Sequence, residues 1–202
     1  MDTKELIQEA ALELFSQKGF DSASVRDIAG KIGIKDSSLY FHYKNKQAIL
    51  DSLIDKFITI SEQMMSLLDG IIESITTIDD ESFCAITEQY VERYFLNDFI
   101  SRFIMVMNHE RSHNQRLRKE YIYWCIKKPI EFQMIVIKRL QDIGYLKMFD
   151  AQYITLEYYA PIFMFFNLYL GHDYTETDKK LFKEAVIAAT KNFVCMYKNE
   201  EK

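Results

Sequence analysis

The residues with the most obvious chemical potential are two histidines that flank a glutamate. The segment His109–His113 reads H-E-R-S-H, the H-E-x-x-H spacing that on a helix directs two imidazoles to one face for zinc, with the glutamate as general base. The extended motif needs glycine and histidine where Arg116 and Lys119 stand. We therefore expect no zinc hydrolase. A solvated helix end is favoured over a metal or polar-ligand contact by His109 or His113.

The sequence offers no other set of residues arranged for catalysis. It lacks a G-x-S-x-G elbow, a P-loop and a dinucleotide fingerprint. Cys84, Cys125 and Cys195 are odd in number and widely spaced, which favours inert, reduced thiols over a disulfide framework or a zinc site. A redox-sensing role for one of them is the alternative. We expect a protein that is not an enzyme and that uses no metal and no cofactor.

The segment from Ser24 to Lys46 predicts two short amphipathic helices around a glycine turn. The apolar face of the first helix is formed by Val25, Ile28, Ala29 and Ile32. Gly33 follows, where a tight turn needs a positive φ angle. Phe41 and Tyr43 are expected in the core. This layout is that of a helix-turn-helix, whose second helix reads the major groove.

The residues of this region also resemble a known family. The matching positions are Phe15, Gly19, Ser24, Ile28, Ala29, Gly33, Leu39, Tyr40, Tyr43 and Lys46. Over about the first 55 residues the chain resembles the tetracycline-repressor (TetR/AcrR) family of regulators. Ile32, Lys35 and Ser37 depart from the pattern, where the family commonly has alanine, a small cap such as serine, and often glycine. The last two lie at the base-reading end, so they affect the target sequence and not the fold.

The resemblance implies that the third helix enters the major groove and that helix N-termini contact phosphates. The candidate DNA-binding residues are Ser24, Lys35, Asp36, Ser37, Ser38, Tyr40, His42 and Lys46. Ser24 and Lys46 suit phosphates, and residues 35–38 suit base edges. Tyr40 and His42 suit the sugar–phosphate backbone or a thymine methyl. The alternative is that Tyr40 belongs to the core and Lys46 is merely solvated.

The distribution of charge agrees with a local DNA-binding surface. The chain has 202 residues, 49% of them hydrophobic, and a net charge of −5. Between Ser22 and Leu50, however, five basic residues face two acidic ones. A basic patch on an acidic protein fits a DNA reader that is not a general DNA coat.

The rest of the chain predicts an all-α protein: an N-terminal three-helix head, a connector helix and a larger helical body for ligand binding and dimerisation. We expect a DNA-binding domain at 1–46 and a second domain at 47–202, whose connector helix covers about 46–69. The seam of the connector is Leu50, Leu53, Phe57, Ile60, Met64, Leu67 and Ile71. Further helices are expected at 81–96, 98–110, 114–142 (kinked or split at Pro129), 151–170 and 177–198, the last two separated by residues 171–173.

One short recognition helix makes too few contacts for specific binding, so we expect a homodimer that reads a palindromic operator. The last two helices are assigned to the dimer surface, because their alanines allow close approach. The assigned residues are Phe163, Phe166, Leu181, Ala185, Ala188 and Ala189. The alternative is that this face packs within one subunit.

The body is rich in aromatic residues, which suit a pocket for a small, mostly apolar effector. The candidate pocket residues are Tyr94, Phe103, His109, Tyr121, Trp124 and Tyr159, although any one of them is more often plain core. The most apolar stretch, 158–170, is too short to span a bilayer, and the N-terminus has no signal peptide, so we expect a cytoplasmic protein without membrane contact.

The expected function is therefore that of a transcriptional regulator of double-stranded DNA controlled by an effector. The expectation that it represses comes from the family resemblance. The alternative is a DNA-bound protein-interaction module without a small-molecule effector.

Overall fold

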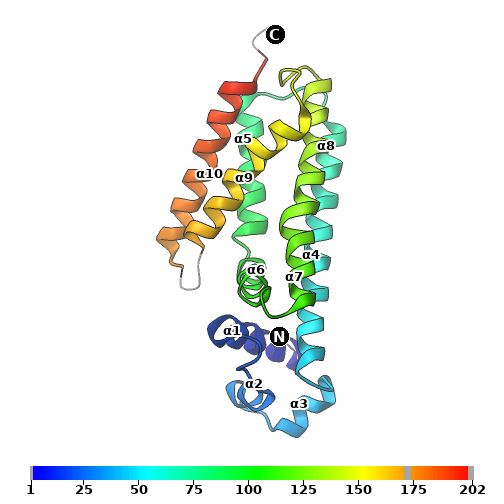
Figure 1. The fold of residues 1–202 in the computed structure, drawn as a ribbon, viewed down its shortest axis with the longest axis vertical. Coiled ribbons are helices and arrows are strands. Elements are labelled where there is room, and N and C mark those ends of the chain that lie inside the picture. The colour runs from blue at the N-terminus through cyan, green and yellow to red at the C-terminus, as the bar shows by residue number, and fades with distance from the viewer. Residues whose placement is uncertain (1, 171–173, 200–202) are drawn as a thin grey trace. The chain divides into compact units, whose positions relative to one another are not determined.

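The computed structural model describes residues 2–170 and 174–199, and within these the regular structure is helical (Figure 1). The elements are α1 (Thr3–Lys18), α2 (Val25–Lys31), α3 (Asp36–His42), α4 (Lys46–Ser74), α5 (Asp80–Tyr90), η1 (Val91–Phe95), α6 (Asp98–Glu110), α7 (Gln115–Ile122), η2 (Tyr123–Lys127), α8 (Lys128–Asp142), α9 (Ala151–Tyr169) and α10 (Glu176–Tyr197). An isolated antiparallel bridge joins Leu146 to Lys198. The all-α prediction is confirmed, and the predicted break at 171–173 lies outside the described residues.

Two compact units make up the fold. The head unit consists of Met1–Ser61 and Asp98–Ile122, and the body unit of Glu62–Asn97 and Tyr123–Lys202. The head unit thus combines α1–α3 and the first part of α4 with α6 and α7. Helix α4 starts at residue 46, where the domain boundary was predicted, and it continues without a break from the head unit into the body unit. The predicted division into domains 1–46 and 47–202 stays a prediction.

The buried face of α4 follows the predicted seam only over its first turns. Leu50, Leu53 and Phe57 are fully buried, as a contact seam requires. Further along, Leu67 is 46% exposed, and Leu68 is buried in its place. A straight α-helix has 3.6 residues per turn, so a strict 3.5-residue pattern drifts around it, and the later part of the predicted seam is wrong for that reason.

The predicted helix 114–142 is divided by the π-helical segment η2, immediately before Pro129 in the first turn of α8. Proline has no N–H group, so the carbonyl four residues earlier, that of Cys125, loses its usual donor. The hydroxyl of Tyr159 donates to this carbonyl at 3.0 Å. Tyr159, predicted to line an effector pocket, therefore has a structural role at the helix junction.

Candidate nucleic-acid interface

Ser24 starts α2 through a reciprocal capping box. Its hydroxyl oxygen accepts from the Asp27 N–H at 3.1 Å, and the Asp27 carboxylate accepts from the Ser24 N–H at 2.9 Å. At the other end of α2, Gly33 has the predicted positive φ, 71°. The Ile34 N–H then bonds the Ala29 carbonyl at 3.0 Å. Helices α2 and α3 are thus joined by a turn that depends on glycine.

The Asp27 carboxylate makes the start of α2 sensitive to acid. Hydrogen bonds from the Lys18 ammonium, at 2.7 Å, and from Ser24 lower the pKa of Asp27 from its usual 3.8 to about 2. The folded state therefore gains stability from ionised Asp27 above about pH 4, and loses it as the pH falls through 2. We expect Asp27→Asn to lower the Tm by roughly 1–4 °C at pH 6, and the difference to vanish towards pH 2. Thermal unfolding measured from pH 2 to 7, with exposed Asp69→Asn as control, checks this; a pH-independent difference would contradict it.

Helix α3 presents one face to the head core and the opposite face to solvent. Leu39 is fully buried, and at 100° per residue Ser37 and Phe41 lie on the far side, one turn apart. Phe41 is 90% exposed and Tyr40 is 53% exposed. The prediction that Phe41 is a core residue is wrong, whereas Tyr43 is buried as expected. Phe41 is a candidate DNA-contacting residue that was not predicted from the sequence. Its spacing of four residues from Ser37 could have indicated it, because that spacing places both side chains on the same face of a helix.

The other candidate contacts differ in exposure. The exposed ones are Ser24, Lys35, Ser37, Tyr40 and His42. Asp36 and Ser38 are half-buried. The Asp36 carboxylate also pairs with Arg26 on α2 at 3.2 Å, so a base would have to share it. The arrangement gives α3 a polar and aromatic outer face suited to base edges and thymine methyls.

Lys46 has a different setting from the phosphate clamp predicted for it. Its ammonium donates to the carbonyls of Phe20 (2.6 Å), Asp21 (3.2 Å) and Ala23 (2.8 Å), and it lies 4.3 Å from the centroid of the Phe20 ring. An ammonium has three donors, and these three carbonyls match them. Lys46 is therefore placed to hold the segment between α1 and α2, while Lys44 is the exposed cation beside it.

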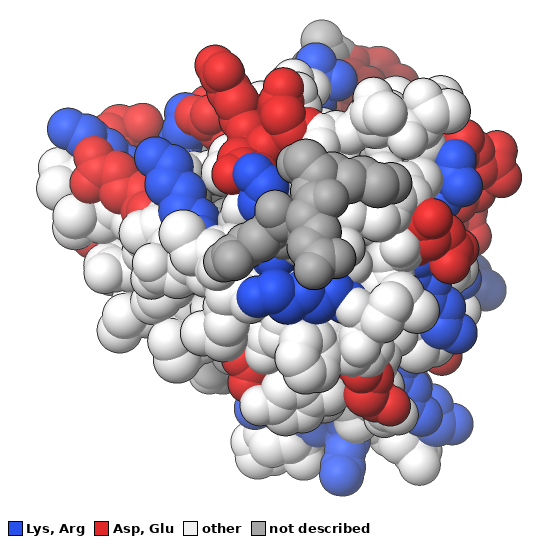
Figure 2. All heavy atoms as spheres, turned by 90° about the horizontal axis from the view of Figure 1, so that it is seen from above, with Lys and Arg blue, Asp and Glu red and all other residues white. Residues whose placement is uncertain are grey.

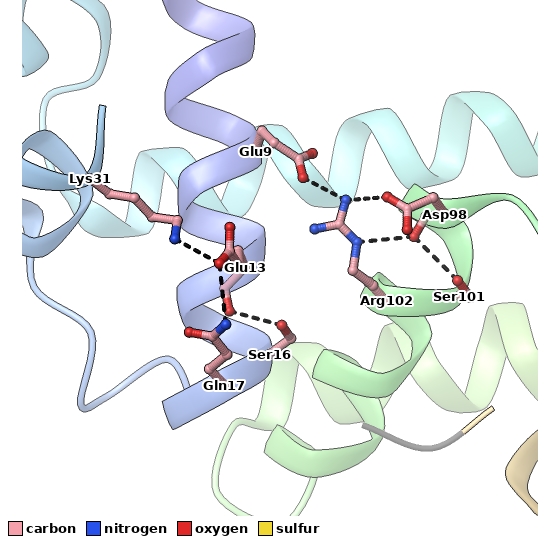
Figure 3. A network of polar contacts seen from close by, with 8 residues as sticks. All are labelled: Glu9, Glu13, Ser16, Gln17, Lys31, Asp98, Ser101 and Arg102. Atoms are coloured by element: carbon pink, nitrogen blue, oxygen red, sulfur yellow. Dashed lines mark hydrogen bonds and ion pairs between the residues drawn. The ribbon is translucent and has the colours of Figure 1, made fainter. Parts of the chain in front are cut away.

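Ion pairs connect α1 to its neighbours in the head unit (Figure 3). The Arg102 guanidinium on α6 bonds Glu9 on α1 at 2.6 Å and also pairs with Asp98. On α2, the Lys31 ammonium bonds Glu13 of α1 at 2.6 Å. Helix α1 is thus linked to both α2 and α6 by ion pairs.

The H-E-x-x-H segment is not arranged as a zinc site. Its residue His109 is 74% exposed at the side chain, whereas Glu110 is 7% exposed and accepts the Phe20 N–H at 2.9 Å. His113 lies in the turn that follows α6. In the described part of the chain, no group of three or more His, Cys, Asp or Glu side chains is placed to hold a metal ion.

The predicted effector residues are divided between the two units. The head unit holds Phe103, His109 and Tyr121, and the body unit holds Tyr94, Trp124 and Tyr159. The aromatic ones are buried in packed contacts: the Tyr94 ring stacks on Tyr90 with centroids 5.7 Å apart, and Arg111 covers Tyr121 at 4.8 Å. Other residues line the apolar cavity of the body unit. The effector pocket therefore stays a prediction.

The predicted dimer residues lie on α9 and α10, which pack side by side (Figure 1). Leu181 and Ala188 are exposed, and Phe163, Ala185 and Ala189 are half-buried. Phe166 is fully buried, with its ring centroid 5.3 Å from Phe95 and 6.2 Å from Phe182. Phe166 thus belongs to the core of a single protomer.

Comparison with known proteins identifies the region. Residues 7–53 match the model of the bacterial regulatory proteins of the tetR family. The class D tetracycline repressor of Escherichia coli is 46% identical over 50 residues, which are 25% of this chain and 23% of the repressor. The match therefore spans about a quarter of that relative's length.

The whole fold has counterparts among solved structures. A TetR family transcriptional regulator from Pseudomonas syringae aligns with a TM-score of 0.64 and 16% identity, over 97% of each chain. The SmeT–triclosan complex aligns with a TM-score of 0.70 and 16% identity, over 100% of this chain and 94% of that one.

Fold and head together define an all-helical protein with an N-terminal helix-turn-helix. Residues 7–53 match the tetR family of bacterial regulatory proteins, and the fold of the whole chain is similar to that of a solved TetR family regulator. That family consists of transcriptional regulators and not of enzymes.

Proposed function

We propose that the chain is a DNA-binding transcriptional repressor that acts in the cytoplasm as a homodimer on a palindromic operator. The observation that carries the proposal is the outer face of α3, where exposed Tyr40 and Phe41 stand beside polar Ser37 on a helix-turn-helix. The repressor named among its relatives supports the direction of control. Among the described helices, none is both long and apolar enough to cross a membrane.

The charge of the helix-turn-helix segment suits a polyanion such as DNA. On the face of the molecule seen in Figure 2, Lys and Arg side chains are intermingled with Asp and Glu and with uncharged residues. The head, in contrast, has a surplus of basic residues between Ser22 and Leu50. Titration of a mixed-sequence duplex at increasing salt tests DNA binding, and we expect affinity to fall steeply with salt. A folded protein that binds no duplex at low salt would contradict the proposal.

The dimer proposal rests on an apolar stripe along α9. Leu156, Met164 and Leu168 are 43%, 57% and 65% exposed and follow a spacing of four, with Ala160 between them. On neighbouring α10, Leu181 is 41% exposed. A row of exposed apolar side chains on two adjacent helices suits a four-helix bundle with a second copy.

Leu168→Glu should convert the dimer into a monomer. In a two-fold symmetric dimer, the two introduced carboxylates, one from each protomer, would be buried in the apolar interface without a positively charged partner. We therefore expect the dissociation constant of the dimer to rise at least about 100-fold. Operator affinity should fall with it. Sedimentation equilibrium at micromolar concentration measures this, with exposed Gln63→Glu on α4 as control. If the variant stays dimeric, the α9 stripe is not the interface.

An effector would bind in the body unit. A cavity of about 30 Å³ lies there between α4, α5, α8 and α9. Its walls include Leu68, Ile72, Phe83, Tyr90, Val136 and Leu140. The Thr87 and Tyr158 hydroxyls, 2.9 Å apart, add polar groups, and burial raises the pKa of Tyr158 to about 12, so that it stays neutral. This lining fits a neutral, mostly apolar molecule with one hydrogen-bonding group.

The alternative function is that of a protein-interaction module without a small-molecule effector, and the small volume of this cavity agrees with it. About 30 Å³ holds only one or two waters, so an effector has to displace side chains. Thermal-shift titration with apolar phenols, triclosan among them, separates the two functions. Saturable stabilisation that Thr87→Leu weakens would support an effector. Absence of any shift, with recruitment of a protein to operator DNA, would support the interaction module.

A further inference from the structure

The segment that joins α1 to α2 is held tightly at its carbonyl groups. It begins at Gly19, whose φ of 81° strains any residue with a Cβ. The Lys46 ammonium then binds the carbonyls of Phe20, Asp21 and Ala23. Since α2 starts directly after this segment, the segment sets the direction in which the helix-turn-helix leaves α1.

Glu110, the last residue of α6, accepts a hydrogen bond from a backbone N–H of the same segment. Its carboxylate oxygen Oε1 accepts the buried N–H of Phe20 at 2.9 Å. A Cβ atom placed on Gly19 would lie 2.8 Å from that oxygen, so the backbone approaches the carboxylate as closely as glycine permits. One short peptide segment thus has its acceptors bound by Lys46 and a donor bound by Glu110.

Glu110 is a costly residue for a purely structural position. Burying a carboxylate is unfavourable unless hydrogen bonds replace its water, and a neutral side chain with a carbonyl acceptor could bind the Phe20 N–H at a lower desolvation cost. The His109 imidazole lies 3.3 Å from Oε1, but it is 74% exposed, so water competes for that contact. The bond to Phe20 is shielded from water, and it joins residues 90 positions apart.

We propose that Glu110 is a positioning residue for operator recognition, an inference that rests on the proposed DNA-binding function. Through the Phe20 N–H, α6 fixes the start of α2, and α2 carries α3 through the turn at Gly33. Without this bond the α2–α3 pair can tilt on α1. Base-edge hydrogen bonds need close alignment, whereas lysine–phosphate contacts tolerate displacement, so sequence discrimination is lost first.

The test compares operator affinity with affinity for mixed-sequence DNA, and measures the salt slope of each. Glu110→Leu keeps a similar volume but removes the acceptor, and we expect the affinity ratio to fall about 10-fold at an unchanged salt slope. Glu110→Gln keeps a carbonyl acceptor and should hold the ratio within about 3-fold of the unmodified protein. Glu62→Leu, an exposed glutamate on α4, serves as control.

The outcomes separate positioning from simple loss of folding. A head that merely unfolds loses both affinities in proportion, so the ratio stays constant. An unchanged ratio in Glu110→Leu, or equal losses in Glu110→Leu and Glu110→Gln, would overturn the inference. If the unmodified protein prefers no DNA sequence, the proposed function is contradicted together with the inference. That result differs from a preference that the Glu110 variants leave unchanged, which contradicts the inference alone.

Discussion

Lys46→Ala should weaken operator binding about 100-fold without reducing the salt dependence of binding. The ammonium of Lys46 donates three hydrogen bonds to carbonyls of the α1–α2 segment. A bond to a charged group is worth up to about 1.5–3 kcal/mol when it is buried. Here two of the three bonds are half-buried and the third is exposed, so water replaces part of the loss, and roughly 2–4 kcal/mol of head stability in total should disappear. The number of protein–phosphate contacts stays the same, because the Lys46 ammonium donates its hydrogen bonds to carbonyls of the protein.

Lys44→Ala provides the matched control, since Lys44 is exposed and lies two residues away. Removing a phosphate contact lowers the salt slope by about one and weakens binding to all sequences alike. We therefore expect Lys44→Ala to change the slope and leave the Tm unaltered, and Lys46→Ala to do the reverse. Anisotropy titrations at several salt concentrations, with thermal unfolding of each variant, measure both. A reduced slope in Lys46→Ala would restore the role of phosphate clamp predicted from the sequence.

Phe41→Ala should weaken operator binding roughly 10-fold or more and leave stability unchanged or slightly higher. Phe41 is 90% exposed in the free protein, so its removal costs the folded state little packing. In a complex its ring is placed to meet thymine methyls or sugars in the groove. Burying an exposed Phe side chain contributes about 1.5–3 kcal/mol. The loss should be larger for the operator than for mixed-sequence DNA.

A suitable control for Phe41→Ala is Met148→Ala, which removes another large, exposed apolar side chain outside the head unit. Binding constants for the operator and for a scrambled duplex, with a urea titration of each variant, separate contact from stability. Equal affinity of Phe41→Ala and the unmodified protein would show that this ring faces away from DNA.

Local signals in the sequence were sufficient to predict the head. The positive φ of Gly33 and the apolar face of α2, of which Ile28 and Ala29 are fully buried, each depend on a few neighbouring residues, and the structure has both. At the start of α4 the Asn45 side chain accepts the Ala48 N–H at 2.8 Å, which is again a contact between near neighbours in the sequence. The burial of Phe41 was predicted wrongly. The seven residues of α3 make barely two turns, which is too short for periodicity to define the buried face.

The body was less predictable because its chemistry depends on packing between distant residues. Tyr159 was a reasonable pocket residue by type, yet its hydroxyl donates to the carbonyl that Pro129 leaves without a donor. Phe166 was a reasonable interface residue, yet its ring packs against Phe95 and Phe182. Composition shows that aromatic residues are available, but only the fold determines which of them meet.

Lys46 shows a further limit of reading roles from sequence. Its position at the start of α4 and its charge both agree with a phosphate contact. Its setting, however, depends on a loop more than 20 residues earlier in the chain, which no local pattern reveals. A residue of the right type in the right place can therefore act through the protein and not through the ligand.

The measurement that tests the central claim most directly is selection of bound duplexes from a random DNA library. The unmodified protein is compared with a Tyr40→Ala/Phe41→Ala variant, whose two changes lie on the exposed face of α3. We expect the unmodified protein to enrich a palindrome with two half-sites about one helical turn apart, and the variant to lose or alter that preference. A folded dimer that enriches no sequence, or a variant that enriches the same palindrome equally well, would contradict the account.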